Sequence, residues 1–410
     1  MHIAILDEEL PFPLTSGKRI RTLNLLKRLA GRHRLTYICH RNADADEASA
    51  AEKHFAELGI HTVVVDRPVP PKAGPRFYAR LAGNLFSPLP YSVATHSSIA
   101  LAQAARVFAM RHKVHLWHCE WTPYAETIKT LPSVPWLVMA HNVESLIWQR
   151  YAETETNPVK RWYIRKQWKK FEAFERWAYT AATRAVAVSP TDAQLMRERF
   201  GAQRVEVVDN GVDTSYFRPT DEPRDPHTIL FLGSLDWRPN QDGVRQLLDS
   251  IFPQVRAQDP AAKLLVVGRN PPDWLVDRVK SCPGVELHGS VPDVRPFMAR
   301  AGVLAVPLRI GGGSRLKILE ALASGLPVVS TRIGAEGLDL LAGRHLDVVE
   351  DCDGMAAGLL AAIHDPQRMR TMTEEGRRTV LTHYDWGALA NRLEAVWLDA
   401  VGQGTVSRAA

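Results

Sequence analysis

The stretch AGVLAVPLRIGGGSRLKILEALASGLPVVSTR, residues 301–332, holds one strand, one helix and a second strand. An apolar run at 301–308 ends shortly before three glycines, and another β-branched run follows at 326–332. Between them, Leu316, Leu319 and Ala323 recur at spacings of three and four residues, which predicts a helix with one apolar face. Two strands joined by one helix are typical of a parallel sheet with crossover connections.

The same alternation of strands and helices extends over the whole chain of 410 residues. Further β-branched runs lie at 2–7, 34–40, 61–66, 114–120, 135–142, 184–190, 205–210, 228–234, 262–269, 284–290 and 346–351. Most gaps carry helical patterning, and residues 210–228, rich in Asn, Gly, Pro and Asp, indicate a linker. We therefore predict an α/β protein with two doubly wound, Rossmann-like domains, 1–210 and 211–380, that face a cleft. A C-terminal helix, 381–410, is expected to cross back to the first domain.

The bulk composition is that of a globular protein, with 45% apolar and 23% charged residues. No apolar run approaches the roughly 18 residues of a membrane span. The four cysteines are far apart and form no CxxC pair, so the sequence predicts neither a zinc site nor a disulfide framework. The first residues, MHIAILDEEL, lack the basic start and cleavage site of a signal peptide, so we expect a cytoplasmic protein.

The charge is unevenly distributed between the halves. Residues 1–210 carry 29 Lys and Arg against 20 Asp and Glu, whereas residues 211–410 carry 22 against 25. A basic half indicates either an anionic partner or a solvated basic surface. The stretch KRWYIRKQWKKFEAFERWAY, 160–179, favours an interfacial helix that places the protein on the inner face of the cell membrane; alternatively, its aromatic residues pack into the core. No recognition motif supports binding of nucleic acid.

The helix predicted after the three glycines begins with unusual charges. Ser314 is a good N-cap, and Arg315 and Lys317 then fall in the first turn, where the helix dipole is already positive. Backbone N–H groups, glycines and two cations together favour a phosphate site, although the order GGGSRLK is not that of a P-loop. The alternative is a surface helix with solvated cations. Glu320 lies beside Lys317 on the helix and either accepts hydrogen bonds from a ribose or simply pairs with Lys317.

Two histidines lie at the carboxyl ends of predicted strands, where doubly wound sheets bind their ligands. His141 is followed by Asn142 and Glu144, and His118 holds a similar position at the end of the preceding strand. A histidine at such a position is more often a hydrogen-bonded structural residue than a catalytic one. Of the two, we favour His141 as the functional residue.

The first predicted strand leads into a second glycine-containing loop that precedes a predicted helix. Ser16, Gly17 and Lys18 open the helix that follows, although Phe12 stands where a P-loop has its first glycine. The loop therefore lacks the P-loop order. Its glycine nevertheless allows the backbone to approach a ligand.

With these motifs assembled, the chain resembles glycosyltransferases of the GT-B fold, in the large group 1 (family 4) class. The motifs that carry the resemblance are AVSPTD (187–192), VVDNGVD (207–213), FLGSLDWRPNQDG (231–243), LLVVGR (264–269), ELHGSVPDVRPFMARAGVLAVPL (286–308), LEALASGLPVVST (319–331) and GAEGL (334–338). In addition, PFPLTSGKRIRTLNLLKRLA (11–30) and HNVES (141–145) are similar to a subgroup involved in bacterial exopolysaccharide assembly.

The resemblance implies that the C-terminal domain binds a nucleotide-sugar and the N-terminal domain binds a glycan or a lipid-linked saccharide. Members are usually retaining enzymes that need no metal, so we expect neither a metal nor a cofactor. Their signature has two glutamates eight positions apart: Glu320 matches the second, ribose-binding one, and Gly312 stands at the first. Members also often carry an Arg and a Lys in a GRL…KG loop. Here Ser234 stands at the Arg position, and no Lys gives a clear match.

These patterns and the resemblance together define a candidate site. The expected donor-binding residues are Gly233, Ser234, Gly289, Ser290, Val291, Gly312, Gly313, Ser314, Arg315, Lys317, Leu319 and Glu320. The expected acceptor-binding residues are Ser16, Gly17, Lys18, His118, Asn142 and Glu144. In catalysis, Arg315 and Lys317 are expected to stabilise the departing diphosphate, with His141 beside the acceptor hydroxyl. Two alternatives stay open: a nucleotide-sugar epimerase of the same fold, and a degenerate, non-catalytic binding subunit, which Gly312 favours.

Overall fold

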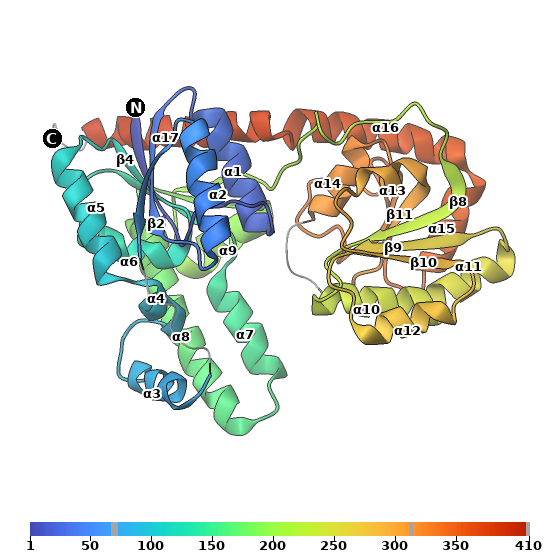
Figure 1. The fold of residues 1–410 in the computed structure, drawn as a ribbon, viewed down its shortest axis with the longest axis horizontal. Helices are drawn as coiled ribbons and strands as arrows, with labels where there is room; N and C mark the ends of the chain where they lie inside the picture. Colours follow the sequence, from blue (N-terminus) through green and yellow to red (C-terminus); the bar gives the residue numbers. More distant parts are fainter. Residues whose placement is uncertain (67–72, 311–314, 407–410) are drawn as a thin grey trace. The chain divides into compact units, whose positions relative to one another are not determined.

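The computed structural model describes residues 1–66, 73–310 and 315–406 and divides the chain into two compact units. Unit 1 comprises Met1–Asp209 and Leu389–Ala410, and unit 2 comprises Asn210–Ala388. Each unit is built on its own parallel sheet with helices on both faces (Figure 1). The predicted fold class, two doubly wound α/β units, is confirmed.

The sheet of unit 1 has seven strands in the order β3-β2-β1-β4-β5-β6-β7. Their bounds are β1 His2–Leu6, β2 Arg34–His40, β3 His61–Val65, β4 Leu116–Cys119, β5 Trp136–Ala140, β6 Arg184–Ala187 and β7 Val205–Val207. The helices are α1 Gly17–Leu29, α2 Ala45–Glu57, α3 Pro75–Asn84, α4 Tyr91–His96, α5 Ile99–Arg111, η1 Thr122–Tyr124, α6 Ala125–Ile128, α7 Glu144–Thr154, α8 Pro158–Ala181 and α9 Pro190–Phe200. The chain order reverses direction between β1 and β4, and such a switch point is where doubly wound sheets bind ligands.

Successive side chains of each strand point to opposite faces of this sheet. One face, which includes Trp117 and Val138, packs against α5, α8 and α9 through residues such as Phe108, Phe171 and Phe200. Because both faces are covered, the strands are apolar on both sides, as is typical of a parallel sheet.

The sheet of unit 2 has six strands in the order β10-β9-β8-β11-β12-β13. Their bounds are β8 Asp225–Leu232, β9 Lys263–Gly268, β10 Val285–Gly289, β11 Ala301–Val306, β12 Val328–Thr331 and β13 Asp347–Val349. The helices are α10 Arg238–Gln246, the π-helical turn η2 Leu247–Ile251, α11 Phe252–Gln258, α12 Asp273–Lys280, α13 Arg295–Arg300, α14 Leu316–Ala323, α15 Met355–His364 and α16 Pro366–His383. Strand β8 lies between β9 and β11, so here too the chain reverses direction at the middle of the sheet.

Two hydrophobic clusters form the core of unit 2, one on each face of the sheet. Phe231 and Val266 belong to the cluster on one face, and their neighbours Leu232 and Val267 belong to the cluster on the other. Helix α14 packs on the second face through Ile318, Leu319 and Leu322. Of the stripe predicted at Leu316, Leu319 and Ala323, α14 buries Leu319 and Ala323, whereas Leu316 is only partly buried.

The strand predictions agree with the structure at every predicted run, with ends that differ by a few residues. The last helix, α17 Trp386–Val406, begins in unit 2 and continues into unit 1, where Leu393 and Trp397 are buried. Residues predicted as a linker at 210–228 include the first part of β8, because this strand begins at Asp225.

Candidate functional site

A cavity of about 290 Å³ lies at the carboxyl edge of the unit 2 sheet. The residues that line it come from the ends of β8, β9 and β10 and from helix α14. They are Leu232, Gly233, Ser234, Val267, Gly268, Arg269, Ser290, Val291, Val294, Lys317 and Glu320. Because the strands are parallel, their carboxyl ends meet at one edge, and the loops that follow enclose the space.

Two glycines allow the backbones around this cavity to approach closely. A Cβ atom added to Gly268 would lie 1.8 Å from the carbonyl oxygen of Gly233, and one added to Gly233 would lie 2.6 Å from the amide of Asn240. The freed space admits Asn240, whose Nδ2 donates to the carbonyl of Ser234 at 2.9 Å. Its Oδ1 accepts from Lys317 Nζ at 3.1 Å, so the glycines indirectly position the ammonium group.

Lys317 and Glu320 are the ionisable pair that α14 directs into the cavity. Burial lowers the pKa of Lys317 to about 8, an effect strengthened by Arg315 and opposed by Glu320. Burial likewise raises the pKa of Glu320 to about 7, and Lys317 opposes this change. A cation and a carboxyl group whose pKa values have both moved toward neutrality, in a cavity, mark a candidate functional site.

Arg315 does not line this cavity, contrary to the prediction that it holds an anion beside Lys317. It occupies the N-cap position of α14, and its guanidinium donates to the carbonyls of Ile333, at 2.8 Å, and Glu336, at 3.3 Å. Its side chain is only 7% exposed and lies 3.5 Å from the Glu336 carboxylate. Arg315 therefore ties the start of α14 to the loop after β12.

The other residues predicted to bind the donor differ in whether they line the cavity. Ser314, predicted as the N-cap, lies outside the described residues, as do Gly312 and Gly313. The side chain of Leu319 is fully buried in the core. Gly289 ends β10 next to the cavity, and a Cβ there would lie 3.1 Å from Pro271. The structure thus brings together Gly233, Ser234, Ser290, Val291, Lys317 and Glu320 from the predicted set.

The prediction missed Arg269, which follows β9 directly. Its Nε donates to Ser234 Oγ at 2.6 Å, across the gap between the ends of β8 and β9. The next residue, Asn270, and Ser290 at the end of β10 both have φ of 53°, in the left-handed region that residues with a side chain seldom adopt. Such strain clusters at functional sites. The position of Arg269 at a strand end, the signal that selected His141, could have identified it.

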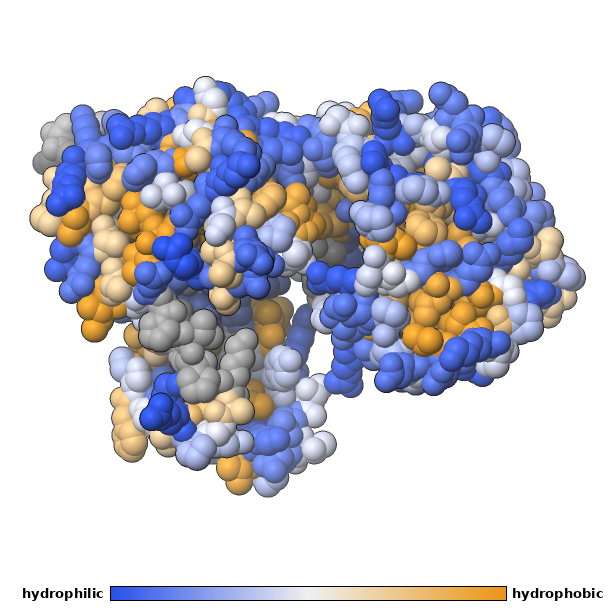
Figure 2. Space-filling model, viewed as in Figure 1, coloured by the Kyte–Doolittle hydropathy of each residue, from blue (hydrophilic) through white to orange (hydrophobic). Residues whose placement is uncertain are grey.

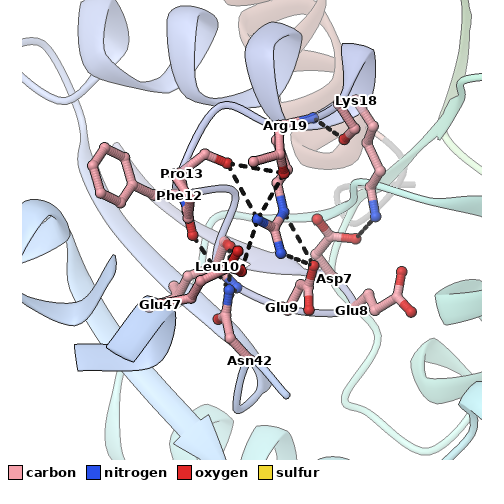
Figure 3. Close-up of polar contacts among 12 residues, drawn as sticks. Asp7, Glu8, Glu9, Leu10, Phe12, Pro13, Lys18, Arg19, Asn42 and Glu47 are labelled. Carbon is pink, nitrogen blue, oxygen red and sulfur yellow. Dashed lines mark hydrogen bonds and ion pairs between the residues drawn. The ribbon is translucent and has the colours of Figure 1, made fainter. Parts of the chain in front are cut away.

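A second group of polar residues surrounds the loop between β1 and α1 in unit 1 (Figure 3). Ser16 caps α1 by accepting from the Arg19 backbone N–H at 3.3 Å. The Arg19 guanidinium forms ion pairs with Glu9, which lies in the loop after β1, and with Glu47 on α2. Lys18 Nζ lies 2.5 Å from Asp7 Oδ1. The loop predicted to approach a ligand is therefore held by several ion pairs.

A fully buried carboxylate, Glu120, connects the strand-end histidines of unit 1. It accepts from Thr22 Oγ1 at 2.6 Å and from His141 Nε2 at 3.1 Å, and its Oε2 lies 3.0 Å from His118 Nε2. Burial alone would raise the pKa of Glu120, but the adjacent His118 and His141 rings hold it well below its usual range. Burial lowers the pKa of His141, and Glu120 partly opposes this.

Of the two histidines, only His141 keeps access to solvent. His118 is fully buried, and its Nδ1 accepts from Trp397 Nε1 on α17 at 3.2 Å. The structure places the His118 ring in the core, away from the surface at which it was predicted to contact an acceptor. The side chain of His141 is 10% exposed at the end of β5.

Asn142 and Glu144 lie at the start of α7. Asn142 is exposed, and Glu144 Oε1 accepts from Trp121 Nε1 at 2.9 Å. The Glu175 carboxylate from α8 accepts from the backbone N–H groups of Glu144, at 2.7 Å, and Ser145, at 3.1 Å. A carboxylate at the amino end of a helix complements the helix dipole, so Glu175 fixes α7 beside His141.

Helix α8 divides into a core half and an exposed half. Phe171, Phe174 and Tyr179 are buried against the sheet, as the alternative reading of 160–179 predicts. The amino-terminal half carries Val159 and Trp162, 73% and 51% exposed, among lysines and arginines. In the part of the chain that the structure describes, no helix is long and apolar enough to span a membrane. The same residues contain no cluster of three or more His, Cys, Asp or Glu side chains arranged to hold a metal ion.

Each half of the chain matches a family profile. Residues 16–216 match the profile described as Glycosyltransferase Family 4, and residues 226–369 match Glycosyl transferases group 1.

Two relatives illustrate the similarity at the level of sequence. A phosphatidyl-myo-inositol mannosyltransferase of Mycolicibacterium smegmatis is 31% identical over 228 residues, which cover 53% of this chain and 58% of that protein. A glycogen synthase of Mycobacterium tuberculosis is 24% identical over 262 residues, or 60% of this chain and 61% of that protein. The chain thus spans about three fifths of the length of these curated relatives.

Solved structures resemble the whole chain in fold. Sucrose-phosphate synthase from Thermosynechococcus elongatus superposes with a TM-score of 0.70 at 19% identity, over 98% of this chain and 100% of the other. The Anabaena protein HepE, in complex with UDP and glucose, gives a TM-score of 0.62 at 15% identity, over 97% and 99%. At these identities the likeness concerns the fold alone.

Proposed function

The chain belongs to the group 1 glycosyltransferases, and we propose that it transfers a sugar from a nucleotide-sugar held by unit 2 to an acceptor held by unit 1. The observation that carries this proposal is the cavity at the carboxyl edge of the unit 2 sheet, where Lys317 and Glu320 meet the glycine-lined ends of β8 and β9. Glu320 accepts hydrogen bonds from the ribose hydroxyls. The Lys317 ammonium contacts the diphosphate, whose negative charge grows as the sugar departs.

The reaction exchanges one bond at the anomeric carbon of the sugar. The bond from this carbon to the diphosphate oxygen breaks, and its electron pair stays on the diphosphate. The acceptor hydroxyl oxygen bonds to the same carbon, and its proton passes to a phosphate oxygen, in a reaction that retains the anomeric configuration. His141, held by Glu120, orients the acceptor, and Lys317 supplies the positive charge without a metal ion.

A panel of nucleotide-sugars tested by thermal shift examines this proposal. A ligand that binds only the native state raises the melting temperature by mass action. We expect one nucleotide-sugar to stabilise the wild-type protein and Glu320→Ala to remove that stabilisation. If no nucleotide-sugar or nucleoside diphosphate shifts the melting temperature, the proposal is wrong. Stabilisation without transfer or hydrolysis of the sugar would instead favour the non-catalytic binding subunit.

We further infer that unit 1 contacts an anionic membrane surface through a region here named the basic lobe, residues 73–86 and 158–170. Figures 1 and 2 show where α3, α7 and α8 project from the sheet, with hydrophilic and hydrophobic residues side by side on that part. The basic lobe contains eight Lys and Arg and no Asp or Glu. Tyr78 and Phe86, 67% and 93% exposed, add to Val159 and Trp162. Such a surface suits an enzyme that glycosylates lipid-linked saccharides in surface polysaccharide assembly.

A further inference from the structure

Arg269 reaches from the end of one strand into the loop that follows its neighbour. Strand β9 lies between β8 and β10, so a residue at its end can turn toward either. The Arg269 side chain turns toward β8, since its Nε donates to Ser234 Oγ at 2.6 Å. Both residues line the cavity that contains Lys317 and Glu320. The guanidinium is therefore placed at the loop after β8.

Ser234 stands where the group 1 pattern often has an arginine, and this loop offers no clear match for the lysine of that pattern. Arg315, the other cation expected near the donor, is occupied by the carbonyls of Ile333 and Glu336. Among the described residues that line the cavity, the cations are Arg269 and Lys317. A diphosphate carries more negative charge than one ammonium group neutralises.

We propose that Arg269 binds the diphosphate of the donor and replaces, from the adjacent strand, the arginine absent at Ser234. This inference rests on the proposed function. The Ser234 hydroxyl accepts from Nε and so orients the planar guanidinium, whose fork of donors suits phosphate oxygens. As the bond between sugar and diphosphate breaks, Arg269 and Lys317 together stabilise the electron pair left on the diphosphate.

The surroundings of Arg269 include an anionic neighbour, Asp236. Asn270 Nδ2 donates to Asp236 Oδ2 at 3.0 Å, and this bond, with the Arg269 charge, holds the pKa of Asp236 below its usual range. Asp236 is thus ionised at neutral pH and attracts the guanidinium in the protein without donor. The more highly charged diphosphate competes with this carboxylate for Arg269.

The test compares ligands that differ only in phosphate content. Uridine, UMP and UDP, and the corresponding guanosine series, are titrated into wild type and into Arg269→Gln, which keeps a donor for Ser234 without the charge. We expect the variant to bind the diphosphate about ten to a hundred times more weakly, the value of one charge-assisted contact, and the nucleoside within about twofold. Equal weakening of nucleoside and diphosphate would mean a structural role and would overturn the inference.

A second step of the experiment moves the positive charge from position 269 to position 234 and tests whether binding is recovered. In an Arg269→Ala background, Ser234→Arg restores an arginine at the position of the group 1 pattern and should recover at least half of the lost binding energy for the diphosphate. Arg332→Ala, which removes an exposed arginine paired with Glu350, serves as the matched control and should change nothing. Circular dichroism and melting temperature verify that each variant is folded.

The outcomes separate this inference from the proposed function. If wild type binds a nucleoside diphosphate and both Arg269→Gln and Arg269→Ala bind it equally well, the inference fails and the proposed function stands. If wild type binds none of the diphosphates of uridine, guanosine, adenosine or thymidine, both fail together.

Discussion

The carboxyl edge of the unit 2 sheet holds two ionisable groups with pKa values near neutrality, whereas that of unit 1 holds a buried carboxylate that accepts hydrogen bonds from two side chains. Lys317 and Glu320 face a cavity of about 290 Å³. Glu120 is buried and accepts from Thr22 and His141. The charges in unit 2 are only partly compensated, so a ligand can complete them, whereas the charge in unit 1 is compensated internally and orders the structure around it.

The comparison predicts that removal of the Glu120 charge lowers the stability of the fold, whereas removal of the Lys317 charge weakens ligand binding. Glu120→Ala should lower the free energy of unfolding by about 3 kcal/mol, because it leaves the buried Thr22 hydroxyl and the His141 ring without their acceptor. Urea unfolding followed by circular dichroism measures this change. Glu206→Ala, which removes an exposed carboxylate on β7, is the matched control and should stay within about 0.5 kcal/mol of wild type.

The effect of Glu120 should also depend on pH with a defined sign. The folded-state pKa of Glu120 lies well below its usual value of 4.5, so its contribution is fully present above that pH. The contribution is lost as the pH falls from there through the folded-state pKa. The stability difference between wild type and Glu120→Ala should therefore shrink in acid. A difference that grows as the pH falls below about 4.5 would contradict the assignment.

Lys317→Met should have the opposite profile: loss of function with little loss of stability. The ammonium is desolvated in the free protein, as its lowered pKa indicates, so its removal should leave the free energy of unfolding unchanged or slightly higher. Binding of the nucleoside diphosphate should weaken about a hundredfold, or by roughly 2 to 3 kcal/mol. Calorimetric titration measures the loss, and a variant that loses stability but keeps affinity would reverse the comparison.

The pH dependence of donor binding offers a finer test of unit 2. Lys317 has a pKa of about 8 in the free protein, so it loses its proton as the pH rises through this value. Bound diphosphate favours the charged form and raises that pKa. The dissociation constant should therefore increase above pH 8, by about tenfold at pH 9. Lys317→Arg should remove this increase, because arginine keeps its charge in this range.

The sequence predicted the backbone far better than the destinations of its long side chains. The strands were predictable because each is a short apolar run between polar turns, and Lys317 and Glu320 because one helical turn separates them. Arg315 was not, since its carbonyl partners come from a loop that local patterns do not place beside it. The burial of His118 was not predictable either, since its hydrogen-bond partner Trp397 is 279 residues away along the chain.

The smallest predicted effect concerns exposed charges of the basic lobe on unit 1. Arg165 and Lys166 lie on the exposed half of α8. Arg176 is also exposed, but it lies on the other half of the helix, whose apolar side chains pack in the core. Each charge near an anionic bilayer contributes about 1 kcal/mol. Arg165→Gln and Lys166→Gln should therefore each weaken binding to vesicles containing phosphatidylglycerol by roughly fivefold.

Sedimentation with vesicles measures this binding, and vesicles of phosphatidylcholine alone separate attraction by charge from insertion of apolar side chains. Arg176→Gln, which removes one exposed charge from the same helix, should change binding less than either variant of the basic lobe. Trp162→Ser should reduce binding to both kinds of vesicle, since the indole contributes through burial in the interface. Equal losses for Arg165, Lys166 and Arg176 would mean that overall charge, and not the basic lobe, attracts the protein to lipid.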